Sequence, residues 1–375
     1  MNKTILAVAT AAVLAGGAIP VAEAAGARSV SGSQGPFTWQ ASNRIVGVNS
    51  TATLAGGGDP RYFAAMPQYS GVAALIMDYG NNNLFICSGT LLPDRRSILT
   101  AAHCVSDGSA DRPLATTAWF YGGDNPDTVV PFNTTPVAVS NYFVNALYTG
   151  EVIDENDIAV LRLGVEAPAF ATDFDLYGGD DLTGLELNVA GYGARSDTGG
   201  NVGANLGTGR LRQGDNRYEV RLGDGDFGGF WDGFFGSAPV DYSYITDFDN
   251  GRPGNDAMCA IAAEFGLGGA KYCNLGLGLD EVAVAGGDSG GPQFIDGRIS
   301  SVTSYGLSFG TDFGDIDGFL NSSFGEFSGY VPVSIHEQFI RDSLYRAPPI
   351  PEPGSLALLG LGLAGLGLSR RRKAA

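Results

Sequence analysis

The stretch G-D-S-G-G-P at residues 287–292 says more about this 375-residue chain than any other segment. Its serine, Ser289, lies between glycines in a turn, where backbone N–H groups are free to point toward a bound carbonyl. A serine hydroxyl becomes a nucleophile when a base removes its proton and hydrogen-bond donors stabilise the resulting oxyanion. The turn itself offers such donors in the N–H groups of Gly287 and Ser289.

The base must be sought among two histidines, because the chain contains no others. His103 lies in T-A-A-H-C, a stretch of small residues that ends a β-like run. His336 lies in an amphipathic pattern near the end of the fold, where we expect a partly exposed polar residue of a helix. A third segment, N-D-I-A-V-L-R-L, places Asp157 at the mouth of an apolar strand. A buried aspartate there can accept the imidazole N–H of His103 and stabilise the imidazolium.

The segments T-A-A-H-C, D-I-A-V-L and G-D-S-G-G-P, in this order, resemble the motifs of the chymotrypsin/trypsin family of serine proteases. The resemblance covers roughly residues 45–345. It implies that His103 is the general base and then the general acid, that Asp157 orients it, and that Ser289 is the nucleophile. It also implies an oxyanion hole formed by the N–H groups of Gly287 and Ser289.

Between the two ends, the chain is rich in short apolar runs bounded by glycine, asparagine, aspartate or proline, which favours β-strands. A helical period is clear only over residues 334–345. With the resemblance, this pattern predicts an all-β, chymotrypsin-like fold of two six-stranded antiparallel β-barrels, at about residues 45–175 and 180–333. A short C-terminal helix follows, and the catalytic site lies between the barrels.

Two further resemblances concern the substrate. Ser304-Tyr305-Gly306 resembles the family strand that pairs with the substrate backbone, which implies that an extended peptide adds as an edge strand. The residue six positions before the nucleophile lies at the base of the primary pocket in this family, and here it is Ala283. An alanine there implies a pocket for small or medium apolar side chains. A one-turn shift of the loop would instead bring one of the acidic residues 280–281 to the pocket.

The sequence R-I-V-G at residues 44–47 resembles the activation junction of the family. Cleavage after Arg44 would free the amine of Ile45, whose charge could pair with Asp288 and order the oxyanion turn. Under this hypothesis residues 26–44 are a propeptide and the protein is a zymogen. The alternative is that the junction is an ordinary start of a strand.

The resemblance also implies that Cys87 and Cys104 form the disulfide next to the histidine. Cys259 and Cys273 would close a loop of about 15 residues, which stabilises a protein by on the order of 3 kcal/mol in the chain-entropy model. We do not expect a metal site at these cysteines, because no C-x-x-C pair is present and neither histidine is placed to complete one.

Both ends of the chain resemble targeting segments. Residues 1–25 have a basic start, an apolar core and an A-E-A cleavage site, which predicts a secretory signal peptide and an oxidising compartment. Residues 347–375 combine P-E-P, about fifteen apolar residues and R-R-R-K, and they resemble the PEP-CTERM sorting signal of Gram-negative bacteria. This implies a secreted or envelope-associated protein and a sorting transpeptidase as partner. The alternative is a simple C-terminal anchor, for which fifteen apolar residues are short.

The formal net charge of −18 argues against nucleic acid as a partner, because its phosphates would repel the protein. Residues 194–256 are rich in glycine and aspartate and studded with aromatic residues, and we interpret them as a surface insertion near the substrate cleft. They also offer oxygen ligands for calcium in Asp247, Asp249, Asn250 and Asp256, although without EF-hand spacing. The sequence predicts no other cofactor.

The sequence therefore predicts an exported serine endopeptidase that hydrolyses protein or peptide substrates through an acyl-enzyme intermediate. The alternative is a catalytically silent surface or matrix binding protein on the same fold. Degenerate relatives usually lose a member of the triad, and all three members are present here. An α/β-hydrolase esterase would need a G-x-S-x-G elbow and the order serine, aspartate, histidine, whereas the order here is the reverse.

Overall fold

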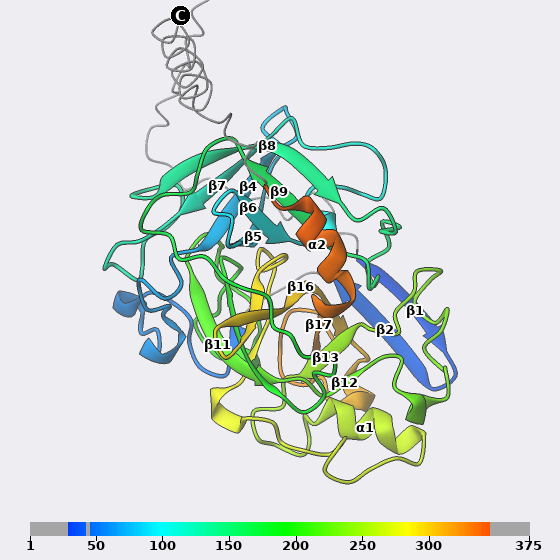
Figure 1. Ribbon diagram of the computed structural model, residues 1–375. Coiled ribbons are helices and arrows are strands. Elements are labelled where there is room, and N and C mark those ends of the chain that lie inside the picture. Colours follow the sequence, from blue (N-terminus) through cyan, green and yellow to red (C-terminus); the bar gives the residue numbers. More distant parts are fainter. Residues whose placement is uncertain (1–28, 43–45, 346–375) are drawn as a thin grey trace, which may run out of the picture.

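The computed structural model describes residues 29–42 and 46–345, and it is built mostly from β-strands in two groups (Figure 1). Three predicted features lie outside the described residues: the signal peptide at residues 1–25, the junction residues Arg44 and Ile45, and the sorting tail. Among the described residues, no helix has the length and apolar character needed to cross a membrane.

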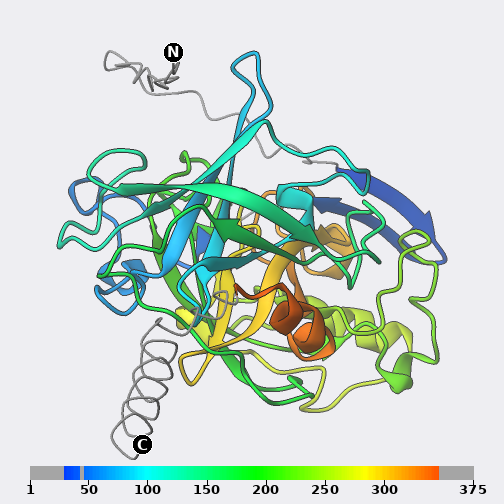
Figure 2. The ribbon, with the colours of Figure 1, turned by 45° about the horizontal axis from the view of Figure 1, so that its top comes forward.

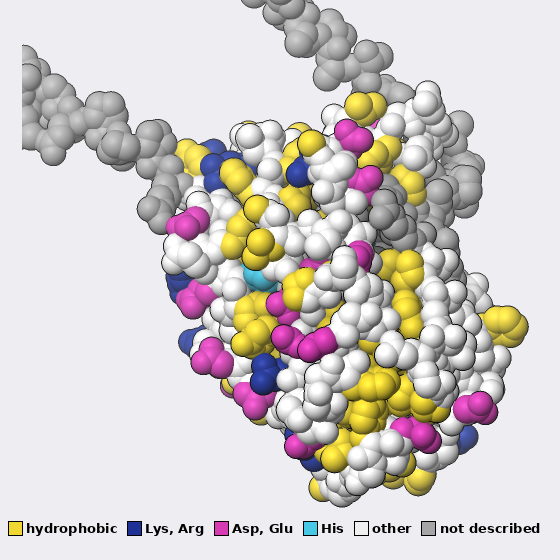
Figure 3. Space-filling model, turned by 90° about the vertical axis from the view of Figure 1, so that its right-hand side faces the viewer, with side chains coloured by type: hydrophobic (Ala, Val, Ile, Leu, Met, Phe, Trp, Pro, Cys, Tyr) yellow, Lys and Arg dark blue, Asp and Glu magenta, His cyan; other side chains and the backbone are white. Residues whose placement is uncertain are grey.

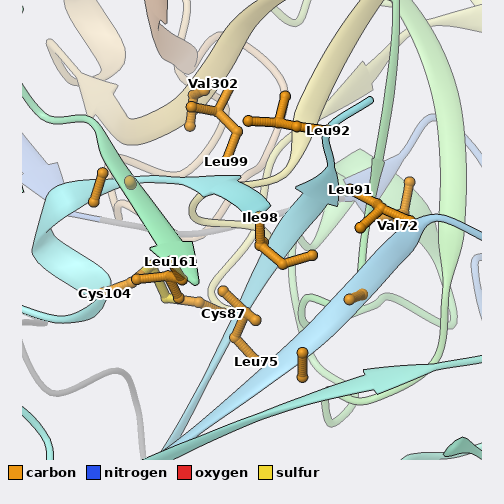
Figure 4. Close-up of a cluster of buried hydrophobic side chains, with 14 of the residues drawn as sticks. Val72, Leu75, Cys87, Leu91, Leu92, Ile98, Leu99, Cys104, Leu161 and Val302 are labelled. Carbon is orange, nitrogen blue, oxygen red and sulfur yellow. A yellow bond between two sulfur atoms is a disulfide. The ribbon is translucent and has the colours of Figure 1, made fainter. Parts of the chain in front are cut away.

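The first group of strands closes into a barrel with the order β4-β5-β6-β9-β8-β7, in the upper half of Figure 1. Every neighbouring pair is antiparallel. Closure leaves this sheet without a free edge. Buried side chains such as Leu75, Ile98 and Leu161 pack together within it (Figure 4). The strands are β4 (Val72–Asp78), β5 (Leu84–Leu91), β6 (Ser97–Thr100), β7 (Ala115–Phe120), β8 (Thr135–Val144) and β9 (Ala159–Leu163).

The second group is an open sheet of nine strands. Its order is β11-β10-β15-β16-β17-β13-β12, with β2 paired to β16 and β1 paired to β2. The all-β fold is confirmed, and its second half is a half-barrel sheet rather than a closed barrel of six strands. The strands are β1 (Val30–Gln34), β2 (Phe37–Ser42), β10 (Glu186–Gly191), β11 (Arg212–Arg217), β12 (Val220–Arg221), β13 (Tyr244–Asp247), β15 (Pro292–Ile295), β16 (Arg298–Ser308) and β17 (Phe327–Pro332). A separate pair joins β3 (Val46–Gly47) to β14 (Val282–Ala283).

Residues 194–256 are part of this sheet and its core, so the interpretation as a surface insertion is wrong. They supply β11, β12 and β13, and their aromatic residues lie in a buried cluster. In that cluster the ring of Phe37 from β2 lies 5.7 Å from Trp231 and 6.2 Å from Phe234, measured between centroids. Burial of large aromatic rings contributes strongly to core stability, which is why these residues face inward.

In residues 29–42 and 46–345, two α-helices accompany the sheets. The expected C-terminal helix is α2 (Glu337–Ser343), which packs beside β9 (Figures 1 and 2). The other, α1 (Ala257–Glu264), was missed because its alanines hide the apolar period. Its N-cap Asp256 accepts a hydrogen bond of 2.8 Å from the backbone N–H of Cys259, a capping contact typical of aspartate.

His336 is not a partly exposed helix residue, because only 6% of its surface is accessible. Its Nε2 lies 2.7 Å from the carbonyl oxygen of Glu155, and its Nδ1 lies 3.1 Å from Nδ2 of Asn145. These partners fix a neutral imidazole with the proton on Nε2. His336 therefore fastens the start of the C-terminal helix to loops of the first barrel.

Candidate active site

His103 and Asp157 meet because their strands are neighbours in the first barrel. His103 follows β6 in a 3-10 turn, Asp157 precedes β9, and Thr100 pairs with Ala159 in the register of these strands. His103 Nδ1 lies 2.7 Å from Asp157 Oδ2, while Asp157 Oδ1 accepts a hydrogen bond of 2.8 Å from the backbone N–H of His103. The two contacts orient the ring, so that Nε2 is the nitrogen that can exchange a proton with a hydroxyl group.

Ser304 brings the second half of the molecule to this pair. It lies on β16, and its hydroxyl donates a hydrogen bond of 2.6 Å to Asp157 Oδ2. The sequence predicts a substrate contact for Ser304 and gives no sign of this bond. No local pattern could reveal it, because the two residues are 147 positions apart.

The turn that carries Ser289 packs against the first barrel next to His103. The carbonyl oxygen of Ser289 accepts a hydrogen bond of 2.8 Å from the backbone N–H of Ser88 and lies 3.6 Å from Cys104 Sγ. Ser289 Oγ is buried and forms no hydrogen bond within the described part of the chain. Gly287 has φ of +101°, a backbone conformation that favours glycine.

Two backbone donors of this turn have no acceptor. Within residues 29–42 and 46–345, the N–H groups of Gly287 and Ser289 donate no hydrogen bond, whereas that of the intervening Asp288 donates to the carbonyl of Ala285 at 2.9 Å. Two neighbouring free amides are what an oxyanion needs. The arrangement can therefore stabilise negative charge that develops beside the Ser289 hydroxyl.

The carboxylate of Asp288 points away from solvent and holds the turn in place. It accepts hydrogen bonds from the backbone N–H groups of Gly193 at 2.8 Å and Ala285 at 2.9 Å. A Cβ atom at Gly191 or Gly193 would lie 2.2 Å from this carboxylate, so both positions need glycine. Burial raises the pKa of Asp288 well above its usual range, and the bond from Gly193 opposes that shift. The amine expected from Ile45 lies outside the described residues.

Ala283 is buried on β14, with 2% of its surface accessible. The acidic residues before it have other partners. Asp280 forms an ion pair of 2.7 Å with Arg61. Glu281 is fully buried and accepts two hydrogen bonds of 3.1 Å from the backbone N–H groups of residues 249–250. Both carboxylates are thus engaged in contacts outside the position of Ala283.

The rest of the expected substrate strand lies inside the molecule. The side chain of Tyr305 is fully buried, and its hydroxyl lies 2.7 Å from Ser243 Oγ. Gly306 is paired with Ser42 of β2, a neighbour that the sequence analysis did not anticipate. The backbone edge at Gly306 is thus already part of a sheet.

Both expected disulfides are present, Cys87–Cys104 beside His103 and Cys259–Cys273 after α1. The first joins β5 to the 3-10 turn of the histidine. The bonded sulfurs are not thiolate ligands for a metal. The described residues that could hold a cation through carboxylates are Asp247, Asp249 and Asp256.

Comparison with known families gives two matches. Residues 67–219 match the trypsin family, a range that includes His103 and Asp157 and ends before Ser289. Residues 349–373 match the PEP-CTERM protein-sorting motif, which indicates export to the cell envelope or beyond in Gram-negative bacteria and implies a sorting system. A trypsin-family domain supports a serine-type peptidase. Residues 67–219 are thus similar to the trypsin family, and residues 349–373 match the PEP-CTERM protein-sorting motif.

Proposed function

We propose that the protein is an exported serine endopeptidase whose catalytic residues are His103, Asp157 and Ser289. The observation that carries the proposal is the buried His103–Asp157 contact of 2.7 Å, next to a turn with a buried, unbonded serine hydroxyl. A purely structural serine in such a place would be expected to satisfy its hydroxyl, because an unpaired buried polar group is costly. A reactive serine instead has to remain available to the substrate.

The reaction follows from the positions of these groups. Ser289 Oγ attacks the peptide carbonyl while His103 Nε2 takes the hydroxyl proton, and Asp157 stabilises the imidazolium that forms. The N–H groups of Gly287 and Ser289 hold the oxyanion. His103 then gives its proton to the leaving amine, which leaves an acyl group on Ser289. Water, deprotonated by His103, releases the acyl group.

The proposed substrates are proteins or peptides with a small or medium apolar side chain before the scissile bond. Ala283 supplies no charge to attract lysine or arginine, and the partners of Asp280 and Glu281 support the same preference. Ser304 and Tyr305 would offer the backbone that pairs with the peptide, whereas the edge at Gly306 is already paired with Ser42.

Maturation is proposed to involve both ends of the chain. A signal peptide at residues 1–25 is removed on export, and a sorting transpeptidase acts on residues 347–375. Cleavage after Arg44 frees the amine of Ile45 for the Asp288 carboxylate, so residues 26–44 act as the propeptide of the domain at 45–345. N-terminal sequencing of fully active protein tests this step, which a start at Ala25 or Gly26 would exclude.

The function is tested with a peptide series and an active-site serine label. Ser289→Ala should abolish labelling and reduce hydrolysis to background, whereas Ser140→Ala, an exposed serine on β8, should leave both unchanged. Absence of labelling in the wild type would favour the alternative, a silent surface or matrix binding protein. Equal hydrolysis by Ser289→Ala would exclude the proposed nucleophile.

A further inference from the structure

Four carboxylates are buried together where β13 meets α1, away from the proposed catalytic residues. Their accessible fractions are 2% for Glu219, 2% for Asp247, 0% for Asp249 and 5% for Asp256. One carboxylate oxygen from each of the three aspartates lies within 4.8 Å of the others. Such a group is costly to bury, because like charges repel and each loses its hydration.

Among the described residues, burial raises the pKa of Glu219 and the charge of Arg217 lowers it, but Arg217 forms no ion pair with Glu219. Within the described residues, none of the four carboxylates forms an ion pair with a lysine or arginine. Burial and then repulsion from Glu219 raise the pKa of Asp247 well above its usual range. Backbone N–H groups satisfy only part of the set: Met258 donates to Asp247 Oδ2 at 3.1 Å and Gly251 donates to Asp249 Oδ1.

Several buried oxygens of this cluster and of the neighbouring Asn250 lack an amide or hydroxyl partner among the described residues. Asn250 Oδ1 and Glu219 Oε1 form no hydrogen bond among the described residues. Asp249 Oδ2 has no amide or hydroxyl partner there, and the Asp249 carboxylate lies beside the carboxyl group of Glu281. Besides burial, the charges of Asp256 and Asp249 raise the pKa of Glu219, so its carboxylate lies near theirs. Buried oxygens without donors are what a bound cation would satisfy.

We propose that Asp247, Asp249 and Asp256, together with Glu219, bind one calcium ion. Hard divalent cations take oxygen ligands, and calcium accepts six to eight of them at about 2.3–2.6 Å in irregular geometry. Oxygens up to 4.8 Å apart can all reach one ion at that distance. Magnesium needs shorter bonds and a near-regular octahedron, which this cluster of β-strand, loop and N-cap carboxylates does not favour.

The test uses chelated full-length protein, calcium chloride, and Asp256→Asn, because asparagine is as good an N-cap as aspartate and preserves α1. We expect the wild type to bind one calcium ion by titration calorimetry and its Tm to rise by roughly 5 °C at saturating calcium. Asp256→Asn should lose at least tenfold in affinity and most of the Tm shift. The matched control Asp312→Asn, at an exposed aspartate, should behave like the wild type.

Three outcomes would overturn the site: no calcium binding by the wild type, an equal response in Asp256→Asn, or a larger response to magnesium than to calcium. If Asp256→Asn does not fold, Asp249→Asn replaces it, because its amide oxygen can keep the bond from Gly251. In that variant the loss of a buried charge should also raise the Tm without calcium, which a merely structural aspartate would not do.

A second inference concerns β2 and rests on the proposed function. This strand pairs antiparallel with β16, with Ser42 opposite Gly306, Ala41 opposite Leu307 and Gln40 opposite Ser308. The opposite edge of β16 is paired with β17. β16 is therefore paired on both sides at Gly306 and Leu307.

β2 cannot easily leave this position. Phe37, Trp39 and Ala41 are 2%, 5% and 0% accessible, and Phe37 and Trp39 each lie 5.0 Å from another ring, those of Phe313 and Phe235. Figure 3, which faces the right-hand side of Figure 1 where the β1–β2 hairpin lies, shows hydrophobic side chains gathered over the lower half of the molecule. After a cleavage following Arg44, the β1–β2 hairpin would thus remain bound to β16 and to the aromatic residues around Phe37 and Trp39.

We infer that β2 limits the substrate to the backbone of Ser304 and Tyr305, so that the enzyme recognises few residues before the scissile bond. In β-augmentation each added residue brings backbone hydrogen bonds, and those beyond Gly306 are already made by β2. The enzyme then selects by the residues nearest the scissile bond rather than by a long extended segment.

A peptide series with one to five residues before the scissile bond tests this. We expect kcat/KM of the wild type to rise up to two residues and then to change by less than threefold. Trp39→Ala, which loosens the hairpin, should gain at least tenfold on the longest peptides at an unchanged rate of Ser289 labelling. A wild-type gain of tenfold or more from residues three to five overturns the inference, even if Trp39→Ala does not fold. Failure of labelling and hydrolysis altogether would instead defeat the proposed function.

Discussion

The hydroxyl group of Ser304 donates a hydrogen bond of 2.6 Å to Oδ2 of Asp157, the same oxygen that contacts His103 Nδ1. Asp157 comes from the first barrel and Ser304 from the second sheet, so this bond crosses between the two halves of the molecule. A carboxylate held by three donors is fixed in orientation, and the imidazole it orients is fixed with it.

Replacing Ser304 by alanine should therefore slow catalysis without unfolding the protein. A hydrogen bond to a charged group contributes about 1.5–3 kcal/mol, so kcat/KM should fall by about 10- to 100-fold. The measurement is the rate of Ser289 labelling together with peptide hydrolysis. Ser304→Thr keeps the hydroxyl and should recover part of the loss; equal rates for both variants would contradict a positioning role for this hydroxyl.

A methyl group at Gly193 should disable the oxyanion turn. The added Cβ would lie 2.2 Å from the Asp288 carboxylate, which is buried and held by the N–H groups of Gly193 and Ala285. We expect Gly193→Ala to lose at least 100-fold in labelling rate and about 2–3 kcal/mol of unfolding free energy. Gly178→Ala is the matched control, because nothing lies within 4 Å of its Cβ position. Normal labelling of Gly193→Ala would show that Asp288 does not hold the turn.

Both disulfides should contribute to stability, but only Cys87–Cys104 should also affect catalysis. They span 17 residues for Cys87–Cys104 and 14 for Cys259–Cys273, so each should contribute on the order of 3 kcal/mol to stability. Replacing either pair by serine should lower the Tm by a similar amount. Only loss of the first should also lower kcat/KM in the folded protein, because it holds the turn of His103. An equal loss of activity in both variants, at a temperature where both are folded, would contradict a specific role of Cys87–Cys104 in holding the turn of His103.

Part of the geometry of the candidate site could be predicted from the sequence, because three short motifs carry it. The glycines around Ser289 and the carboxylate before β9 are local features, and the structure brings His103 and Asp157 together. The sequence does not reveal contacts made by residues far apart, such as Ser304 with Asp157 or Ser42 with Gly306. Both depend on strand register across the molecule, which hydrophobic patterns do not specify on their own.

The all-β class of the fold could be predicted from the sequence, but the arrangement of its second half could not. Short apolar strands indicate β-structure, but a glycine- and aspartate-rich stretch with aromatic residues looks like a surface loop, whereas residues 194–256 supply three strands of the sheet. The aromatic rings find their partners on β2, which lies before the junction at Arg44. A core shared between such distant segments leaves no periodic signal in either of them.

The buried imidazole of His336 should make stability fall in mild acid. Burial lowers the pKa of His336 below its ordinary value of 6.5, so the folded protein resists a proton that the unfolded chain accepts. The contribution of neutral His336 to the free energy of unfolding is therefore fully present above pH 6.5. It decreases as the pH falls below that value, by at most about 1.4 kcal/mol per pH unit. His336→Gln, which can keep both a donor and an acceptor, should lack this component. Urea unfolding of both proteins between pH 7.5 and 5 gives the difference in slope, since the carboxylates contribute equally to both. Parallel curves would mean that the pKa of His336 is not lowered in the folded protein.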